Sequence, residues 1–291
     1  MLMDNYCIYS NSRFTKTEMN PEHIIPLSLG GANAFTIFVS KAKNSEVNHK
    51  VDAKMNNDFL VKIRQVQHGF KGHSGTEPIV KIKKAKVGSN PASWELSQND
   101  LKIYDHIEKQ NLYGEQSTTL SVQMDLTVRY KFVAKVALAT GYFMFGDVFV
   151  NNADHEALRT LVFADDVENP RLDLRFYDEF SSPGVLDIPQ SNSWEINKLI
   201  ASRVKSSGVI WGYSTNRIIA HVFVGSTLLG MVNFSAKVEA FHADNDVHDD
   251  FGAVIRMQNN TIFSQIQYRR ELEEVLTYLD SLKSVAHLPS T

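Results

Sequence analysis

Residues 22–31 constrain the fold of this chain more than any other segment. The stretch begins with a carboxylate next to a histidine, Glu22-His23, and runs through Pro26 into the pair Gly30-Gly31. Proline fixes φ, and glycine adopts backbone conformations that other residues avoid, so this spacing favours a tight turn. We therefore expect a hairpin, with Glu22 and His23 close to its bend.

A strand at residues 35–39 and a helix at residues 41–60 are expected to follow this hairpin. Val47, Val51, Met55 and Phe59 recur at four-residue spacing, which predicts one buried stripe along the helix. Ser40 directly precedes the helix and is a suitable N-cap. The N-terminal part therefore reads as a hairpin followed by an amphipathic helix.

The residue types in this part suit the hydrolysis of a phosphodiester. Histidine can take a proton from water at neutral pH. A divalent cation such as Mg²⁺ neutralises phosphoryl charge and prefers oxygen ligands, which Glu22 and Asn44 offer. Because consecutive residues of a strand face opposite ways, Glu22 and His23 share one site only if the backbone bends between them.

Residues 22–31, followed by Asn44 on a helix, resemble the HNH endonuclease family over about residues 6–60. The resemblance implies a ββα-metal fold, in which two strands and a helix hold one divalent ion. It implies that His23 is the general base, Glu22 a metal ligand and Asn44 the last ligand, on the helix. It also implies a DNA substrate and Mg²⁺, with Mn²⁺ or Ni²⁺ as alternatives.

The position of the last ligand is decided by the phase of the helix. At about 100° per residue, His49 lies about 140° from Asn44 and about 160° from Val47, which places it on the solvent side. Asn44, Asn48 and Asp52 follow one another at four-residue spacing, on the edge of the helix that can face the hairpin. We therefore expect Asn44 as the ligand, assisted by Asn48, and His49 in a position to touch DNA.

The resemblance also implies a middle asparagine that orients the hairpin and the base. Asn33 is the candidate, although it lies nearer to the glycine pair than is usual in the family. A backbone group near Phe35 is the alternative.

Many family members carry two CxxC pairs that bind a structural zinc, and this chain departs from them. The corresponding places hold Cys7 with Ser10 and Ser40 with Lys43. One thiol cannot make such a site, so we expect no structural zinc. Packing must stabilise the module instead, with help from the rest of the chain.

The charge distribution indicates where a polyanion would bind. Residues 1–86 carry 13 Lys/Arg against 7 Asp/Glu, whereas residues 87–291 carry 17 against 26. Lys41 and Lys43 lie at the start of the expected helix, where backbone N–H groups attract phosphate, and His49 and Lys50 follow. We expect these four side chains to contact DNA, without strong sequence specificity.

We predict two domains, 1–70 and 71–291, joined in the glycine-rich stretch 68–75. The second is expected to be a mixed α+β domain with an antiparallel sheet. Gly225-Ser226 is typical of a hairpin turn between strands 217–224 and 227–234. A further strand is expected at 79–87, and helices at 129–145, 154–163 and 265–283. No catalytic motif is recognisable in this region.

Composition limits the setting of the protein. A single cysteine excludes an internal disulfide framework and fits a reducing compartment, so we expect a cytoplasmic protein. No apolar run approaches the roughly 18 residues that span a bilayer, and the first residues do not resemble a signal peptide.

Three functional interpretations stay open. The chain is a metal-dependent DNA endonuclease or nickase, a decayed nuclease that only binds nucleic acid, or a sensor or interaction protein whose second domain controls the nuclease. The second domain also leaves room for a homo-oligomer or a partner protein. From the resemblance we infer a setting in phage defence or in a mobile element.

Overall fold

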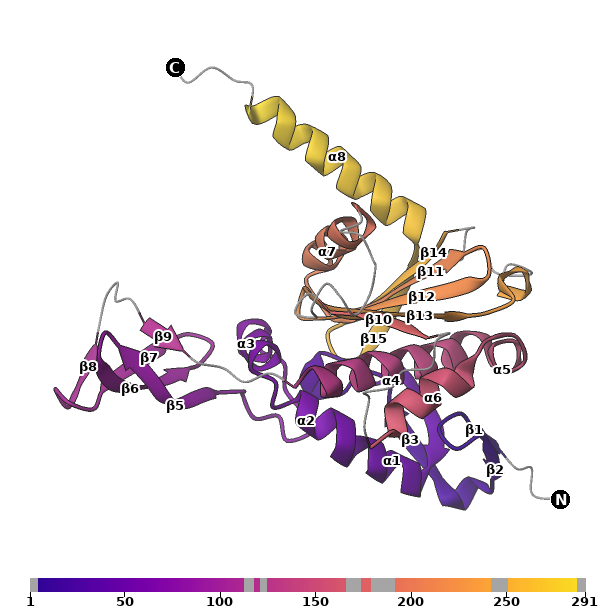
Figure 1. The fold of residues 1–291 in the computed structure, drawn as a ribbon, viewed down its shortest axis with the longest axis horizontal. Helices are drawn as coiled ribbons and strands as arrows, with labels where there is room; N and C mark the ends of the chain where they lie inside the picture. The colour runs from indigo at the N-terminus through magenta and orange to yellow at the C-terminus, as the bar shows by residue number, and fades with distance from the viewer. Residues whose placement is uncertain are drawn as a thin grey trace.

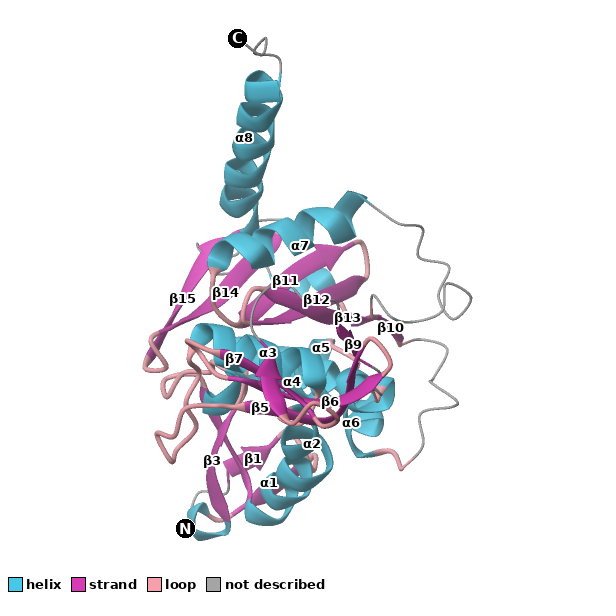
Figure 2. Ribbon diagram, turned by 90° about the vertical axis from the view of Figure 1, so that its left-hand side faces the viewer, coloured by secondary structure: helices cyan, strands magenta, loops and turns pink. Residues whose placement is uncertain are grey.

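The computed structural model describes residues 5–112, 118–120, 125–165, 174–178, 192–241 and 251–286. Helices mix with antiparallel sheets, as the sequence predicts, and every strand pair within these ranges is antiparallel. Figures 1 and 2 show the helix α4 (Leu126–Phe145) between the N-terminal segment and the largest sheet.

The N-terminal segment has the predicted order of hairpin and helix. The short strands β1 (Asn5–Cys7) and β2 (Ser12–Phe14) pair first. Strand β3 (Met19–His23) then pairs with β4 (Thr36–Ser40), and α1 (Lys41–Val47) follows directly. The Ser40 side chain accepts a hydrogen bond from the Lys43 backbone N–H at 3.3 Å, which confirms the predicted N-cap.

The helix predicted over residues 41–60 is not continuous. After α1 the chain widens into a π-helical turn, η3 (Asn48–Asp52), continues as α2 (Ala53–Met55) and then breaks. A separate helix, α3 (Phe59–His68), begins where Asp58 accepts a hydrogen bond from the Val61 N–H. The predicted stripe is buried at its first three positions and only partly buried at Phe59, beyond the break.

The break has a tertiary cause. The Asp58 carboxylate that caps α3 also pairs with Arg129 of α4 at 3.0 Å, and both side chains are buried. Arg129 is held further by Asp178 at 2.8 Å. This buried ion pair joins residues 71 positions apart, so the spacing within residues 41–60 carries no sign of it.

Two larger sheets follow. A five-stranded sheet, ordered β8-β7-β6-β5-β9, projects away from the rest of the molecule on the left of Figure 1. Its strands are β5 (Val80–Val87), β6 (Asn90–Leu96), β7 (Leu101–Asp105), β8 (Gln110–Leu112) and β9 (Thr118–Leu120).

The six-stranded sheet has the order β10-β13-β12-β11-β14-β15. The predicted turn Gly225-Ser226 joins β12 to β13, and both of its residues have positive φ, 52° and 66°. The strands of this sheet are β10 (Arg175–Tyr177), β11 (Gly208–Ser214), β12 (Arg217–Val224), β13 (Thr227–Ser235), β14 (Gly252–Gln258) and β15 (Ile262–Gln267).

Helices cover both faces of this sheet (Figure 2). On one face lies α4, which begins one turn before the predicted start, at the cap Asp125, and is followed by α5 (Asp147–Asn152) and α6 (His155–Phe163). On the other face lie α7 (Asn192–Val204) and the start of α8 (Tyr268–Ala286). The last helix was predicted from residue 265, but β15 continues to Gln267.

One hydrophobic core extends from the N-terminal segment into the second region. It contains Ile24 and Val51 of the first module, Ala134 and Leu138 of α4, and Val222 of β12. The boundary at residue 70 stays a prediction, and the two regions that it separates share this core. None of the described helices is long and apolar enough to cross a membrane.

Candidate active site

The end of β3 brings Glu22 and His23 to the same cavity, which has a volume of about 410 Å³. In a regular strand these two neighbours would face opposite ways. Here the alternation is broken. The Lys135 Nζ ammonium donates to the carbonyl oxygens of both His23 (2.9 Å) and Ile24 (3.1 Å). Consecutive carbonyls of a strand normally point to opposite sides, so the backbone bends at His23, as a shared site requires.

His23 is oriented by the predicted middle asparagine. Its Nε2 lies 3.1 Å from Asn33 Oδ1. Because that oxygen only accepts, Nε2 carries the proton and Nδ1 keeps its lone pair. Asn33 is itself held from the second region, since its backbone N–H donates to the Asn260 carbonyl at 3.0 Å, in the turn before β15.

A buried ion triad lies beside the histidine. Lys135 Nζ is 2.7 Å from Glu22 Oε1 and 3.1 Å from Asp52 Oδ2, and its side chain is fully buried. The contact with Asp52 has the geometry of a hydrogen bond, whereas the contact with Glu22 is an ion pair only. Glu22 and Asp52 therefore approach each other with one cation between them.

Burial governs the charge of the triad. Burial raises the pKa of Asp52, the Lys135 charge lowers it, and the nearby Glu22 raises it again, and the net result is a pKa of about 7. Burial also lowers the pKa of Lys135, but the two carboxylates outweigh it, so this pKa lies above its ordinary value. Lys135 is thus held in its charged form.

The π-helical turn helps to align the polar side chains of the helix with the cavity. Residues four apart drift by about 40° per step along an α-helix, and a wider turn reduces that drift. The cavity is lined at four-residue spacing by Asn44, Asn48, Asp52 and Asn56.

These side chains differ in which polar atoms are already hydrogen-bonded within the chain. Asn44 Nδ2 donates to Asn20 Oδ1 (3.0 Å) and to the Pro21 carbonyl (3.2 Å), which turns the amide nitrogen toward β3. Asn56 Oδ1 accepts from Ser28 Oγ and Gln65 Nε2 and so has a structural role. The bonds of Asn44 occupy its amide nitrogen, so its amide oxygen is the atom left for a ligand, and its role in metal binding stays a prediction.

The donor set fits a hard cation that keeps several waters. No three His, Cys, Asp or Glu side chains converge as a metal group within the described residues, which leaves no zinc-binding group there. The cavity instead offers carboxylate and amide oxygens from Glu22, Asp52, Asn44 and Asn48. Asp52 Oδ1 is buried and has no hydrogen-bond partner among the described residues, so it is a further candidate for a cation ligand.

Asp52 and His73 line the cavity, although the sequence prediction gives neither of them a role in the site. Asp52 was placed on the correct edge of the helix but without a role. His73, read as part of a linker, lies with its ring centroid 5.4 Å from that of His23 and lines the cavity. No local pattern marks His73, because the chain returns to the site only through the loop after α3.

The four predicted DNA-contact residues lie outside the cavity. Lys41 and His49 are exposed, which agrees with the helix phase for His49. Lys43 pairs with Glu46 at 2.8 Å and stacks 4.0 Å from the Phe163 ring centroid. Lys50 pairs with the same Glu46 at 3.0 Å. Lys43 and Lys50 thus form ion pairs within the chain, and their contact with DNA stays a prediction.

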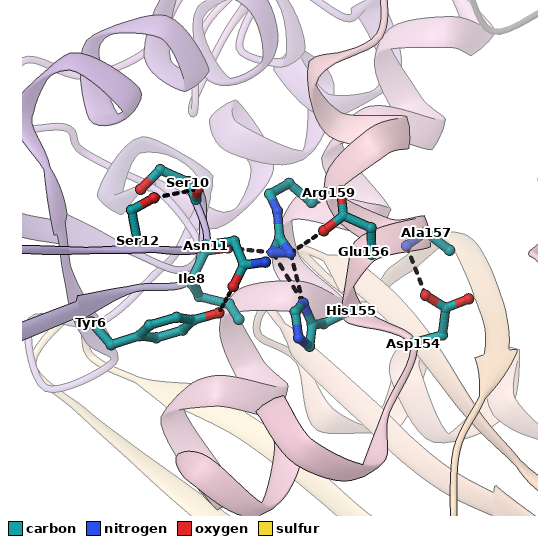
Figure 3. Close-up of polar contacts among 10 residues, drawn as sticks. All are labelled: Tyr6, Ile8, Ser10, Asn11, Ser12, Asp154, His155, Glu156, Ala157 and Arg159. Atoms are coloured by element: carbon teal, nitrogen blue, oxygen red, sulfur yellow. Dashed lines mark hydrogen bonds and ion pairs between the residues drawn. The ribbon is translucent and has the colours of Figure 1, made fainter.

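The turn after β1, where many family members carry a CxxC pair, is held by hydrogen bonds between protein groups. Cys7 Sγ accepts a hydrogen bond from the Ser40 N–H at 3.2 Å, which links the two places that correspond to CxxC pairs in many family members. Figure 3 shows Arg159 of α6 reaching this turn, where its Nη1 donates to the Ile8 carbonyl at 3.1 Å. The guanidinium is fixed by His155 Nδ1 (2.8 Å) and Glu156 Oε2 (2.6 Å) of the same helix.

Comparison with known proteins identifies the N-terminal module. Residues 7–60 match the family model described as HNH endonuclease. The match spans β1 to the start of α3 and includes Glu22, His23, Asn33 and Asn44. Neither the curated proteins nor the solved structures gave a match.

Proposed function

We propose that this protein is an endonuclease that hydrolyses DNA phosphodiester bonds with one divalent cation, Mg²⁺ or alternatively Mn²⁺ or Ni²⁺. The observation that carries the proposal is the pairing of His23 with Asn33 beside the oxygen donors of one cavity. The match of residues 7–60 to the HNH endonuclease family supports the same chemistry.

His23 acts as the general base. With Nε2 donating to Asn33, its Nδ1 accepts a proton from a water molecule whose oxygen attacks the phosphorus, and the bond to the leaving oxygen breaks. Glu22, Asn44 and Asp52 hold the cation, assisted by Asn48. When bound, the cation acts as a Lewis acid that stabilises charge on the phosphoryl and leaving oxygens.

DNA approaches from the exposed side of the cavity, without strong sequence specificity. Lys41 and His49 lie exposed on the helix that lines it, so they are the first candidates for phosphate contacts. Such contacts give binding that weakens with salt. The single cysteine fits a cytoplasmic protein, and the resemblance suggests a setting in phage defence or in a mobile element.

Supercoiled plasmid incubated with Mg²⁺, Mn²⁺ or Ni²⁺ tests the proposal. We expect nicked or linear product from the full chain, and a loss of about 10²–10⁴-fold with His23→Ala. DNA affinity and melting temperature should stay unchanged. His106→Ala, at an exposed histidine in the turn between β7 and β8, is the matched control.

Plasmid that stays intact with every metal would instead favour a protein that only binds nucleic acid. Unchanged cutting by His23→Ala would refute the assigned base. Control by the second region is the remaining alternative, and one observation favours it: that region supplies Lys135 and the Asn260 carbonyl to the site.

A further inference from the structure

The six-stranded sheet has a second face, turned away from the nuclease module. Side chains alternate across a strand, and β12 follows this rule. Ala220 and Val222 belong to the core shared with α4, whereas Phe223 belongs to a separate cluster with α7 and α8. His221 therefore lies on the outer face, together with Ile219.

A cavity of about 320 Å³ opens on this outer face, bounded by α7 and the start of α8. Its volume is at the small end of the range of about 300–1,000 Å³ for small-molecule sites. No Lys, Arg, Asp or Glu occurs among its described lining residues. Aromatic rings make up much of the wall: Tyr177, Trp194, Tyr213, Phe251 and Tyr268.

A chain of hydrogen bonds fixes one polar group in this cavity. Tyr268 OH donates to Asn197 Oδ1 at 3.0 Å, which leaves Asn197 Nδ2 facing His221 Nε2 at 3.2 Å. An amide nitrogen only donates, so Nε2 is the acceptor and the proton of the neutral ring lies on Nδ1.

That Nδ1–H donor is unused. His221 is 7% exposed, and its Nδ1 has no hydrogen-bond partner in the parts of the chain that the structure describes. Burial lowers the pKa of His221 to about 4, so the ring stays neutral at pH 7 and keeps this single donor. A buried donor without a partner is costly to the fold, and a ligand acceptor would remove that penalty.

We propose that this cavity binds a small, planar, uncharged heteroaromatic molecule that packs against the aromatic wall and accepts a hydrogen bond from His221 Nδ1. The aromatic wall selects a flat ring system. No charged side chain occurs among the lining residues that the structure describes, which disfavours an ionised ligand because its desolvation would not be offset there. The proposal concerns binding alone and holds whether or not the chain cuts DNA.

Benzimidazole and indole are matched probes for the full chain. Both are flat, neutral bicyclic molecules near pH 7.5, but only benzimidazole has a ring nitrogen that accepts a hydrogen bond. Benzoate tests the exclusion of charge. Binding is measured by isothermal titration calorimetry, because indole shares the fluorophore of tryptophan and would mask the fluorescence of Trp194 in the wall.

We expect benzimidazole to bind one per chain with a Kd below about 1 mM, at least tenfold more tightly than indole. Benzoate should not bind. No saturable benzimidazole binding, equal affinity for indole, or tighter binding of benzoate would each overturn the proposal.

Two variants locate the site. His221→Phe keeps the volume and removes the donor, so benzimidazole affinity should fall at least tenfold while indole binding is unchanged. Gly212→Leu should fill the cavity and abolish both, and a Cβ at Gly212 would meet no atom closer than 3.6 Å. Ser214→Leu, an exposed position on the same strand, is the control. Benzimidazole binding that survives in folded Gly212→Leu would place the probe elsewhere and refute the site.

Discussion

Lys135 Nζ lies 2.7 Å from Glu22 Oε1, so an ammonium from the middle of α4 contacts a carboxylate of the nuclease module. The same nitrogen binds Asp52 and the two carbonyls at the bend after β3. One side chain thus pairs with both buried carboxyl groups and holds the backbone bend that places Glu22 and His23 together. The site is assembled by both regions of the chain.

Lys135→Met should therefore destabilise the protein strongly. It leaves two buried carboxylates without their cation, and removal of one partner from such a group typically costs about 3–5 kcal/mol in the free energy of unfolding. Urea denaturation measures the loss. Lys54→Met, at an exposed position on α2, should change the same quantity by less than about 0.5 kcal/mol.

A double-mutant cycle separates this charge effect from a simple loss of packing. Adding Asp52→Asn to Lys135→Met removes one of the buried carboxyl groups that have lost their partner, so the double variant should lose clearly less stability than the sum of the two single variants. Additive losses would contradict the triad.

Asn33→Ala tests the orientation of the base. The substitution removes the acceptor for His23 Nε2, and the ring can then rotate or adopt the other tautomer. We expect plasmid cleavage to fall by about 10²-fold, with the free energy of unfolding nearly unchanged. In a His23→Ala background the same substitution should have no further effect on the residual cleavage. A further tenfold loss there would show that Asn33 acts on another group.

Local signals in the sequence predicted the local structure. Ser40 caps α1 because a side-chain oxygen and a free N–H lie within one turn of each other. Gly225-Ser226 forms the expected turn because both residues tolerate positive φ. Glu22, His23, Asn33 and Asn44 likewise fall within 23 positions of one another and share a family pattern that can be read directly.

Ion pairs between distant parts of the chain could not be predicted from local sequence patterns. Asp52 and Lys135 lie 83 positions apart, and no spacing relates them. One signal was available, since Lys135 is the only charged residue in the apolar run 132–139. A lysine there must be buried, and a buried ammonium requires anionic partners. The sequence could indicate that partners exist but not that they line the same cavity as His23.

Arg159→Met tests whether the hydrogen bond to Ile8 stabilises the turn after β1, where many family members carry a CxxC pair. It removes the donor from the buried Ile8 carbonyl, which should lower the free energy of unfolding by about 1–3 kcal/mol. Excess EDTA should leave the melting temperature of the wild-type chain unchanged, because we expect no metal to brace this turn. A large drop in melting temperature with EDTA would show a structural metal and would contradict this interpretation.

His221 predicts how stability changes with pH. Its pKa in the folded protein is about 4, below the ordinary value of about 6.5 that we take for the unfolded chain. Between these two values the unfolded chain binds a proton that the native ring rejects, so acidification favours unfolding. The free energy of unfolding should fall by up to about 3 kcal/mol as the pH is lowered from 6.5 to 4, and this group should add no slope above or below that window.

Urea denaturation of wild type and His221→Phe across this pH range isolates the effect. The contributions of His68, His155 and the carboxylates are common to both chains and cancel in the difference. We expect the stability of wild type relative to His221→Phe to rise steadily from pH 4 to 6.5 and then to level off. A difference that stays constant across the window would mean that the ring titrates normally, and that the outer face of the sheet is open to water.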